Sequence, residues 1–378
     1  MKILHLIYTE AISGAEKYLK HLLPGLKAYG IDCELMIVSP ESTAGSFVNY
    51  CNELNKLGVK TTLLIANKRS VISTAKKVNA YLKAGNISIV HAHLLISDII
   101  AAVLKTLFNP RVYLISSKHG YQEKLLQQYE PGKNYRPNDL YYFITKLIFR
   151  KIDKNIAVSK GIADLYFNLG LTKTVCPYIH HGIKIEAFNK KDHEAECRMA
   201  DPQLIIVGRV ELFKGHRFLI EAMPFVAAAF PGVKLLVLGE GSEKNNCIEM
   251  VNGLGLQNQV EFLGFKDHPY SYISNSDIII LPSLFEPFGL VYIEAFALKT
   301  PVVAFDTPAG NEIMTDHETA LLVAKGDSGA LAEKIIYLLK NKAAGEAMAE
   351  RAYKKYKEFF TTEVMIKNMS NWYLGLGL

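Results

Sequence analysis

The amino-acid sequence predicts an α/β protein made of two Rossmann-like domains that face a central cleft. The chain has 378 residues, which exceeds the usual size of one hydrophobic core, so two domains are expected. Short apolar segments alternate with amphipathic helical stretches, a pattern typical of doubly wound parallel sheets. A polar, charged stretch, Lys190–Pro202, interrupts this alternation and is the expected linker.

Six segments of the first half are expected to form strands. They are Lys2–Tyr8, Cys33–Val38, Thr61–Ile65, Ile87–His91, Val112–Ser117 and Asn155–Val158. After the first strand, Ser13 is followed three residues later by Glu16, which predicts a capping box at the start of a helix.

The segment His119–Lys154 departs from the tight alternation of strands and helices. Residues 120–138 are polar and contain Pro131, Gly132 and Pro137, so a long loop is expected. An aromatic, basic helix, LYYFITKLIFRK, follows it. This helix either lies on a membrane surface or contributes its Tyr and Phe side chains to the core.

The second half restarts the alternation with short, β-branched, nearly continuous apolar segments, as expected for strands buried on both faces of a parallel sheet. They are Leu204–Val207, Lys234–Leu238, Val260–Leu263, Ile278–Leu281 and Val302–Phe305. The tail, Asp327–Leu378, has helical periodicity and no strand signal. Ligands of such folds bind beyond the carboxyl ends of the strands, so motifs that follow strands are the candidate sites.

Composition and charge narrow the class of protein. No apolar run approaches the roughly 20 residues that cross a bilayer, and the N-terminal segment is interpreted as a strand instead of a signal peptide. The five cysteines form no CxxC pair, which favours a reducing cytoplasm. Residues 1–200 hold 27 Lys/Arg against 16 Asp/Glu, whereas the whole chain carries only +6. This basic first half either attracts anionic lipid, an acidic acceptor or nucleic acid, or is simply a solvated surface.

The strongest motif follows the strand that ends at Leu281. Glu294 is the only charged residue between Pro287 and Leu298, and a carboxylate on so apolar a helix needs a partner. A nucleotide ribose would supply one, and so would a backbone amide or an Arg. Backbone amides of Phe288, Gly289 and Leu290 open this helix and could bind a phosphate. Glu286, just before the helix, is placed either to reach sugar hydroxyls or to stabilise the helix dipole.

A second motif, Gly208–Gly215, directly follows the first strand of the second domain. Its cations, Arg209 and Lys214, could neutralise a diphosphate without a metal ion, or form surface ion pairs with Glu211 or Glu240.

Histidines mark two strand ends of the first domain. His91 and His93 form a His-x-His pair, but no carboxylate or Cys nearby completes a metal-ligand set, so no metal site is expected. His119 either contacts a transferred sugar or packs as a structural histidine. The loop Ser13–Glu16 is not GxGxxG, and no GxxxxGK[ST] sequence occurs, which disfavours dinucleotide enzymes and ordinary nucleotide triphosphatases.

Taken together, these stretches resemble glycosyltransferase family 4, retaining enzymes of the GT-B architecture. The resemblance runs in order along nearly the whole chain, through SGAEKYLKHLLPGL, IVHAH, KHGY, IAVSKGIADLYFNLG, VGRVELFKGHRFLIEA, VKLLVLGEGSE, VEFLGF and LFEPFGLVYIEAFALKTPVVA. The last stretch contains the family's two glutamates, Glu286 and Glu294, separated by seven residues.

The resemblance implies a role for each candidate residue. Arg209 and Lys214 would hold the donor diphosphate, and Glu294 would bind the nucleotide ribose. Glu286 and His119 would face the donor sugar. Amides of residues 288–290 would cradle phosphate and sugar, and Gly14 would close over the diphosphate.

The resemblance also implies the domain organisation. Residues 1–190 would form an acceptor domain onto which a final helix, residues 359–378, packs back, and residues 200–358 would form the donor domain. Three positions depart from the family pattern, which usually has Gly, Pro-Asn and Gly there; they are Ser13, His180–His181 and Ala320. None of them is a charged group assigned above.

The expected function is a metal-independent, retaining transfer of a sugar from a UDP-, GDP- or ADP-linked donor, with no cofactor. The acceptor would be a glycan or a lipid-linked molecule in cell-surface polysaccharide or glycolipid synthesis, and no nucleic-acid partner is expected because no RNP-like motif occurs. A cytoplasmic location is expected, with peripheral binding to the inner face of the membrane left open. The alternatives are a sugar-nucleotide epimerase or hydrolase on the same architecture, and a non-catalytic basic membrane-binding module.

Overall fold

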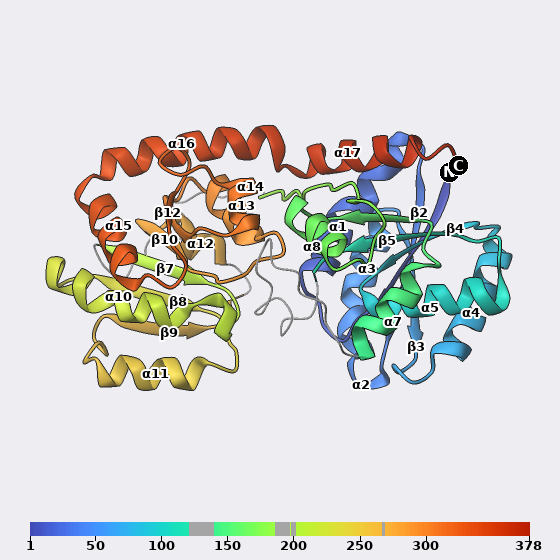
Figure 1. Ribbon diagram of the computed structural model, residues 1–378, viewed down its shortest axis with the longest axis horizontal. Coiled ribbons are helices and arrows are strands. Elements are labelled where there is room, and N and C mark those ends of the chain that lie inside the picture. The colour runs from blue at the N-terminus through green and yellow to red at the C-terminus, as the bar shows by residue number, and fades with distance from the viewer. Residues whose placement is uncertain (121–139, 186–196, 198–201, 267–268) are drawn as a thin grey trace. The chain divides into compact units, whose positions relative to one another are not determined.

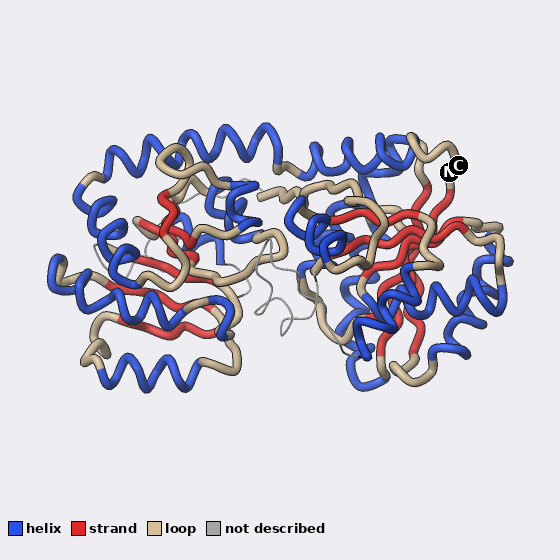
Figure 2. Tube along the Cα trace, viewed as in Figure 1, coloured by secondary structure: helices blue, strands red, loops and turns tan. Residues whose placement is uncertain are grey.

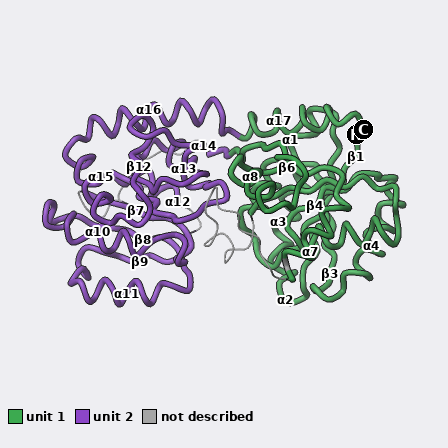
Figure 3. Tube along the Cα trace, viewed as in Figure 1, with its two compact units in different colours: residues 1–182, 362–378 green, residues 183–361 purple. Residues whose placement is uncertain are grey.

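The computed structural model describes residues 1–120, 140–185, 197, 202–266 and 269–378. The chain forms two compact units: unit 1 comprises residues 1–182 and 362–378, and unit 2 comprises residues 183–361 (Figure 3). The expected long loop, residues 120–138, and the expected linker, Lys190–Pro202, lie almost entirely outside the described residues.

Unit 1 is built around a six-stranded parallel sheet with the order β3-β2-β1-β4-β5-β6 (Figure 1). Its strands are β1 (Lys2–Tyr8), β2 (Asp32–Ser39), β3 (Lys60–Ile65), β4 (Ile89–His93), β5 (Tyr113–Lys118) and β6 (Lys154–Ala157). Its helices are α1 (Gly14–Leu26), α2 (Glu41–Ala44), α3 (Val48–Lys56), α4 (Val71–Gly85), α5 (Leu95–Val103), α7 (Leu140–Phe149), α8 (Lys160–Asn168) and α17 (Thr362–Leu374). This strand order is that of a Rossmann fold.

Unit 2 repeats the same arrangement with the order β12-β11-β10-β7-β8-β9, and helices surround its strands as they do in unit 1 (Figure 2). Its strands are β7 (Gln203–Val207), β8 (Lys234–Leu238), β9 (Val260–Gly264), β10 (Ile278–Leu281), β11 (Val302–Phe305) and β12 (Leu321–Val323). Its helices are α10 (His216–Ala229), α11 (Lys244–Gly253), α12 (Pro269–Ser274), α13 (Leu290–Ala297), α14 (Pro308–Ile313), α15 (Ser328–Lys340) and α16 (Lys342–Phe359). The predicted fold class, α/β with two Rossmann-like sheets, is confirmed.

Two details of the strand prediction are wrong. The fourth strand is β4, Ile89–His93, and not Ile87–His91, because the polar histidines continue the strand instead of ending it. His91 is fully buried and pairs in register with His5 of β1. The three-residue strand β12 was not predicted, because so short an apolar run carries little periodicity.

The last helix, α17, belongs to unit 1 and packs on α1. Its side chains Met365, Met369 and Tyr373 are part of the hydrophobic core of unit 1. Gly25 of α1 permits this contact, because a Cβ atom at that position would lie 2.2 Å from Cδ1 of Ile366. Within the described residues, no helix combines the length and the apolar character that crossing a bilayer requires.

Candidate active site

The strand order of each sheet reverses between two central strands, β1 and β4 in unit 1 and β7 and β10 in unit 2. Doubly wound sheets bind their ligands beyond the carboxyl ends of the strands at this point. The predicted site residues follow these strands or their neighbours: Gly14 follows β1, His119 follows β5, Arg209 and Lys214 follow β7, and Glu286, Phe288, Gly289, Leu290 and Glu294 follow β10.

In unit 2, the structure brings the two predicted motifs together. The ammonium of Lys214 and the Oε1 atom of Glu286 form a short ion pair, in which both side chains are mostly buried. The Ser283 hydroxyl donates to the same carboxylate oxygen at 3.0 Å. The backbone N–H of Leu284 donates to the carbonyl of Phe213 at 2.8 Å, which ties the two loops together.

The ion-pair alternatives considered for Lys214 are therefore wrong, since its partner is neither Glu211 nor Glu240. Glu211 accepts a hydrogen bond from the Ser242 hydroxyl at 2.7 Å, and this contact is the main reason why the pKa of Glu211 is lowered. The positive charge of Arg209 contributes to the same lowering of that pKa. Glu240 pairs with Lys244 at 2.8 Å.

Arg209 is exposed and lies close to the ring of Phe213. Its guanidinium carbon is 5.3 Å from the centroid of the Phe213 ring, and the Lys214 ammonium is 5.6 Å from the same centroid. Both cations thus lie near one aromatic ring in the loop after β7, where they can act on the same anion.

Helix α13 begins directly after Gly289, whose φ of 95° lies in the left-handed region. A Cβ atom at this position would lie 2.3 Å from Cδ2 of Tyr292, so only glycine fits without a shift. The amides at the start of α13 carry the positive end of the helix dipole, which favours an anion. Phe288 is buried and Leu290 partly buried.

Glu294 lies half-buried on α13. Tyr270 of α12 lies beside it, and the pKa of the Tyr270 hydroxyl is raised mainly by burial and further by the Glu294 carboxylate and a hydrogen bond with it. The expectation that this carboxylate needs a polar partner is thus met within the protein by a residue that sequence reasoning did not single out.

A small pocket in unit 2 is lined by Lys214, Glu286 and Gly289 together with His216, the first residue of α10. His216 is buried, and neither of its ring nitrogens has a hydrogen-bond partner within the described part of the chain. Burial, followed by the charge of Lys214, lowers the pKa of His216 to about 4, so the ring is neutral at pH 7. Sequence reasoning did not single out this residue.

In unit 1, Gly14 is the first residue of α1 and lies within the predicted capping box, between Ser13 and Glu16. The Ser13 backbone N–H donates to Oε2 of Glu16 at 2.8 Å, and the Ser13 hydroxyl donates to the same oxygen at 2.7 Å. Glu16 is fully buried. The capping box is confirmed and fixes the loop that carries Gly14.

His119 belongs to a chain of hydrogen-bonded rings behind the carboxyl ends of β1 and β4. Its Nε2 atom lies 3.0 Å from Nδ1 of His93, and Nε2 of His93 lies 2.9 Å from Nδ1 of His5. Tyr373 of α17 joins the chain, with its hydroxyl 3.5 Å from His5 and in a short hydrogen bond with His91. Burial lowers the pKa of His119 to about 3, helped by the Lys118 charge.

A metal site was not expected at His91 and His93, and the structure adds His5 as a third histidine. Ring nitrogens of these three residues lie within 4.8 Å of one another. Their rings, however, stack with interplanar angles of 15° to 29°, so their in-plane lone pairs do not converge on one point. His91 also hydrogen-bonds Ser117 through Nε2 at 2.7 Å. This geometry fits a hydrogen-bonded chain better than a metal centre.

A cavity of about 350 Å³ in unit 1 has Gly14 and His119 in its wall. Its inner surface includes Asp98 and Lys118, a buried ion pair 2.9 Å apart that the sequence did not reveal. Burial raises the pKa of Asp98 and lowers that of Lys118. The Lys118 ammonium also lies 3.7 Å from the centroid of the Phe149 ring, so its donors are well satisfied.

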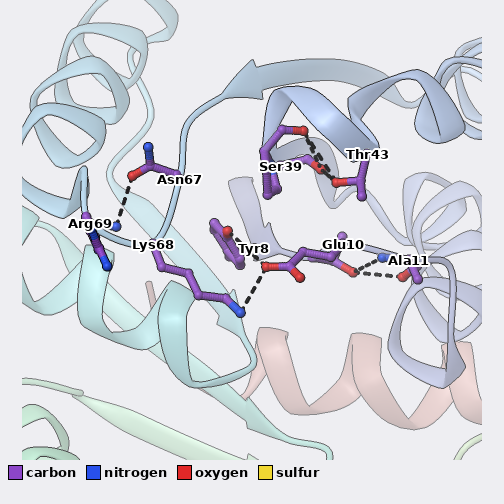
Figure 4. Close-up of polar contacts among 10 residues, drawn as sticks. Tyr8, Glu10, Ala11, Ser39, Thr43, Asn67, Lys68 and Arg69 are labelled. Carbon is purple, nitrogen blue, oxygen red and sulfur yellow. Dashed lines mark hydrogen bonds and ion pairs between the residues drawn. The ribbon is translucent and has the colours of Figure 1, made fainter.

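A further polar cluster occupies the carboxyl ends of β1, β2 and β3 (Figure 4). Glu10 accepts from the Tyr8 hydroxyl at 3.3 Å and pairs with Lys68 at 2.9 Å. The hydroxyls of Ser39 and Thr43 lie 2.9 Å apart. These groups line the sheet edge where ligands of this fold class bind.

Comparisons with known proteins show which families and folds this chain resembles. Residues 12–187 match the family described as Glycosyltransferase Family 4, and residues 188–355 match Glycosyl transferases group 1. The fold resembles a glycosyltransferase from Rickettsia africae, with a TM-score of 0.79 at 21% identity over 98% of this chain and 97% of that one. It also resembles Anabaena Alr3699/HepE in complex with UDP-glucose, with a TM-score of 0.78 at 18% identity over 99% and 100% of the chains.

The fold and the arrangement of these loops define a protein of the two-sheet α/β glycosyltransferase class, GT-B. The chain belongs to glycosyltransferase family 4. A curated relative is N-acetylgalactosamine-N,N'-diacetylbacillosaminyl-diphospho-undecaprenol 4-alpha-N-acetylgalactosaminyltransferase of Campylobacter jejuni, 29% identical over 57% of this chain and 59% of that protein. The chain spans between 59% and 64% of the length of the first three curated relatives that it matches.

Proposed function

We propose that this protein is a retaining glycosyltransferase that moves a sugar from a nucleotide-diphosphate donor to a hydroxyl of a glycan or lipid-linked acceptor, in the synthesis of a cell-surface polysaccharide or glycolipid. The observation that carries the proposal is the meeting of Lys214, Glu286 and the start of α13 at the point where the strand order of unit 2 reverses. This arrangement offers a cation, a carboxylate and the backbone amides of a helix N-terminus at one edge of a sheet, which is what a sugar diphosphate requires.

We assign the donor contacts as follows. The diphosphate binds the amides at the start of α13 and the cations Arg209 and Lys214. Glu286, whose carboxylate lies beside Lys214, accepts hydrogen bonds from sugar hydroxyls, and Glu294 binds the ribose next to Tyr270. Gly14 and His119 of unit 1 keep the roles that the family resemblance implies, contact with the diphosphate and with the donor sugar.

The proposed reaction breaks the bond between the anomeric carbon and the phosphate oxygen, with positive charge developing on the sugar ring. Arg209, Lys214 and the α13 amides stabilise the negative charge that accumulates on the departing diphosphate. The acceptor hydroxyl attacks from the face that the diphosphate leaves, and its proton passes to the leaving phosphate oxygen. Configuration at the anomeric carbon is therefore retained, and no metal ion is required.

A lipid-linked acceptor is supported by the Campylobacter jejuni relative, whose name specifies a diphospho-undecaprenol acceptor. A UDP-linked donor is supported by the Anabaena structure, which holds UDP-glucose. Both assignments are carried over to this chain as part of the proposal.

The test is an assay of nucleotide release from UDP-, GDP- and ADP-linked sugars, with and without a lipid-linked acceptor extract. Release that depends on acceptor, with an unchanged anomeric configuration by NMR and unchanged rate after chelation with EDTA, is the expected result. Rapid conversion of donor alone would favour the epimerase or hydrolase alternative. No conversion of any donor would favour the non-catalytic membrane-binding module.

A further inference from the structure

Helix α7 is apolar on the side that faces the protein and on the side that faces outward. Its inward side chains, Tyr142, Thr145, Ile148 and Phe149, are between 1% and 7% exposed. Four apolar side chains on the other side are exposed: Leu140 at 75%, Phe143 at 51%, Ile144 at 37% and Leu147 at 61%. We call these four residues the α7 outer face.

The spacing of the α7 outer face is that of one helical stripe, at positions i, i+3, i+4 and i+7. A helix that is apolar all round is normally covered on every side, and a contiguous exposed apolar patch marks a binding surface. On the other helices of the described residues, exposed apolar side chains such as Phe225 at 61% form no such stripe.

The charged side chains within α7 and directly after it are positive. Residues 140–149 contain no acidic side chain, and Lys146 lies within them. Arg150 and Lys151 follow directly after the end of α7, and both are exposed. The first acidic residue after α7 is Asp153, which forms an ion pair with Lys105 at 2.5 Å.

An exposed apolar stripe next to positive charges favours one kind of binding partner over another. A second copy of the chain packed through the same face would bring its own α7, which contains no acidic side chain to pair with these cations. An anionic bilayer offers an apolar layer for the four side chains and phosphates for the cations at its surface. We propose that the α7 outer face is a docking surface for an anionic membrane.

The consequence for acceptor choice rests on the proposed function. Thr145 and Phe149, on the inward side of α7, line the cavity whose wall contains Gly14 and His119. A helix is about 10–12 Å across with its side chains, so the cavity lies roughly one helix diameter from the docked surface. That depth suits the sugar or phosphate head of a membrane-anchored acceptor.

The test is flotation of the full chain with vesicles of phosphatidylcholine alone and of phosphatidylcholine mixed with phosphatidylglycerol. Strong, salt-sensitive binding to the anionic vesicles is expected. The double variant Phe143→Ser/Leu147→Ser should lose about tenfold or more in partitioning. Arg150→Gln/Lys151→Gln should lose about fivefold for each cation removed, and only on anionic vesicles.

The matched control is Leu57→Ser/Ile72→Ser, which removes two apolar side chains of unit 1 with exposures of 54% and 61%. It should bind vesicles as the unchanged chain does. Thermal unfolding and the shift caused by UDP are measured on every variant, so that loss of folding or of donor binding is seen separately from loss of docking. Equal vesicle binding by the Phe143→Ser/Leu147→Ser variant, or a dimer that this variant converts to monomers in light scattering, would overturn the proposal.

Discussion

The ammonium of Lys214 and the carboxylate of Glu286 form an ion pair between two loops whose residues are 72 positions apart in the sequence. The pair brings Lys214, the residue proposed to bind the diphosphate, and Glu286, the residue proposed to bind the sugar, to one edge of the unit 2 sheet. Because the Ser283 hydroxyl also donates to Glu286, the carboxylate is oriented from two directions. Much of the proposed donor chemistry depends on this contact.

Replacing Glu286 with Gln removes the charge that orients Lys214 and keeps the size of the side chain. Transfer is expected to fall by about 100-fold, since small misplacements of a binding group have effects of that order. The thermal midpoint should change little. The control is Glu240→Gln, which removes the partner of Lys244 in an exposed ion pair and should leave turnover unchanged. Comparable rates in both variants would contradict the assignment of Glu286.

Gly289→Ala is expected to lower both stability and transfer. The left-handed backbone alone costs about 1–2 kcal/mol for a residue with a Cβ, and this Cβ would also press on Tyr292. Gly253→Ala is the control, because Gly253 ends α11 with an ordinary backbone and nothing within 4 Å of the added Cβ. That change should be neutral or stabilising by about 0.5–1 kcal/mol. Thermal unfolding of the two variants gives the comparison. Equal midpoints would refute the claim that Gly289 is required by its left-handed backbone and its contact with Tyr292.

Stability should decrease in mild acid because of the buried histidines of unit 1. Burial lowers the pKa of His5 to about 3 and lowers those of His91, His93 and His181 well below 6.5. The unfolded chain therefore takes up protons that the folded chain does not, so stability is complete above about pH 6.5 and is lost as the pH falls toward the folded pKa values. One pH unit below 6.5, each histidine costs about 1.4 kcal/mol.

The measurement is the thermal midpoint at pH about 7.5 and about 5.5. Unit 1 is expected to unfold at a clearly lower temperature at the acid pH. The double variant His91→Asn/His93→Asn removes two of the groups and should flatten this dependence. A midpoint that does not move with pH in the unchanged chain would contradict this, because it would mean that these rings take up protons in the folded chain as they do in the unfolded chain.

Tyr373→Phe should loosen the attachment of α17 to the sheet of unit 1. The Tyr373 hydroxyl hydrogen-bonds the fully buried His91, and its loss leaves a buried nitrogen without that partner. A cost of about 1–3 kcal/mol in the free energy of unfolding is expected. Tyr337→Phe, on α15 with 47% exposure, is the control and should cost nothing measurable. Hydrogen exchange of α17 amides reports the loosening directly, and unchanged exchange would argue against it.

Most of the fold could be predicted because parallel strands are short, apolar and separated by helices. All eleven predicted strands correspond to strands of the structure. The fourth was displaced, since His91 and His93 are polar residues inside a buried strand. The twelfth strand, Leu321–Val323, is too short to carry a pattern of its own.

The candidate site could be predicted only as separate motifs. The spacing within each loop placed Lys214 and Glu286 after neighbouring strands, but nothing in the sequence says that they pair. His5 was missed as a member of the histidine chain because its neighbours are 86 and 88 residues away, and only the parallel register brings them together. Asp98 and Lys118 were missed for the same reason: a buried ion pair has no local sequence signal.

The most direct test of the central claim is the affinity for UDP, measured by titration calorimetry on the unchanged chain and on the variants Arg209→Ala and Lys214→Ala, with Lys244→Ala as the control. If the diphosphate rests between these two cations and the start of α13, each of the two variants should bind UDP at least about tenfold more weakly, while Lys244→Ala should bind as the unchanged chain does. Equal affinity for UDP in all four proteins would contradict the account.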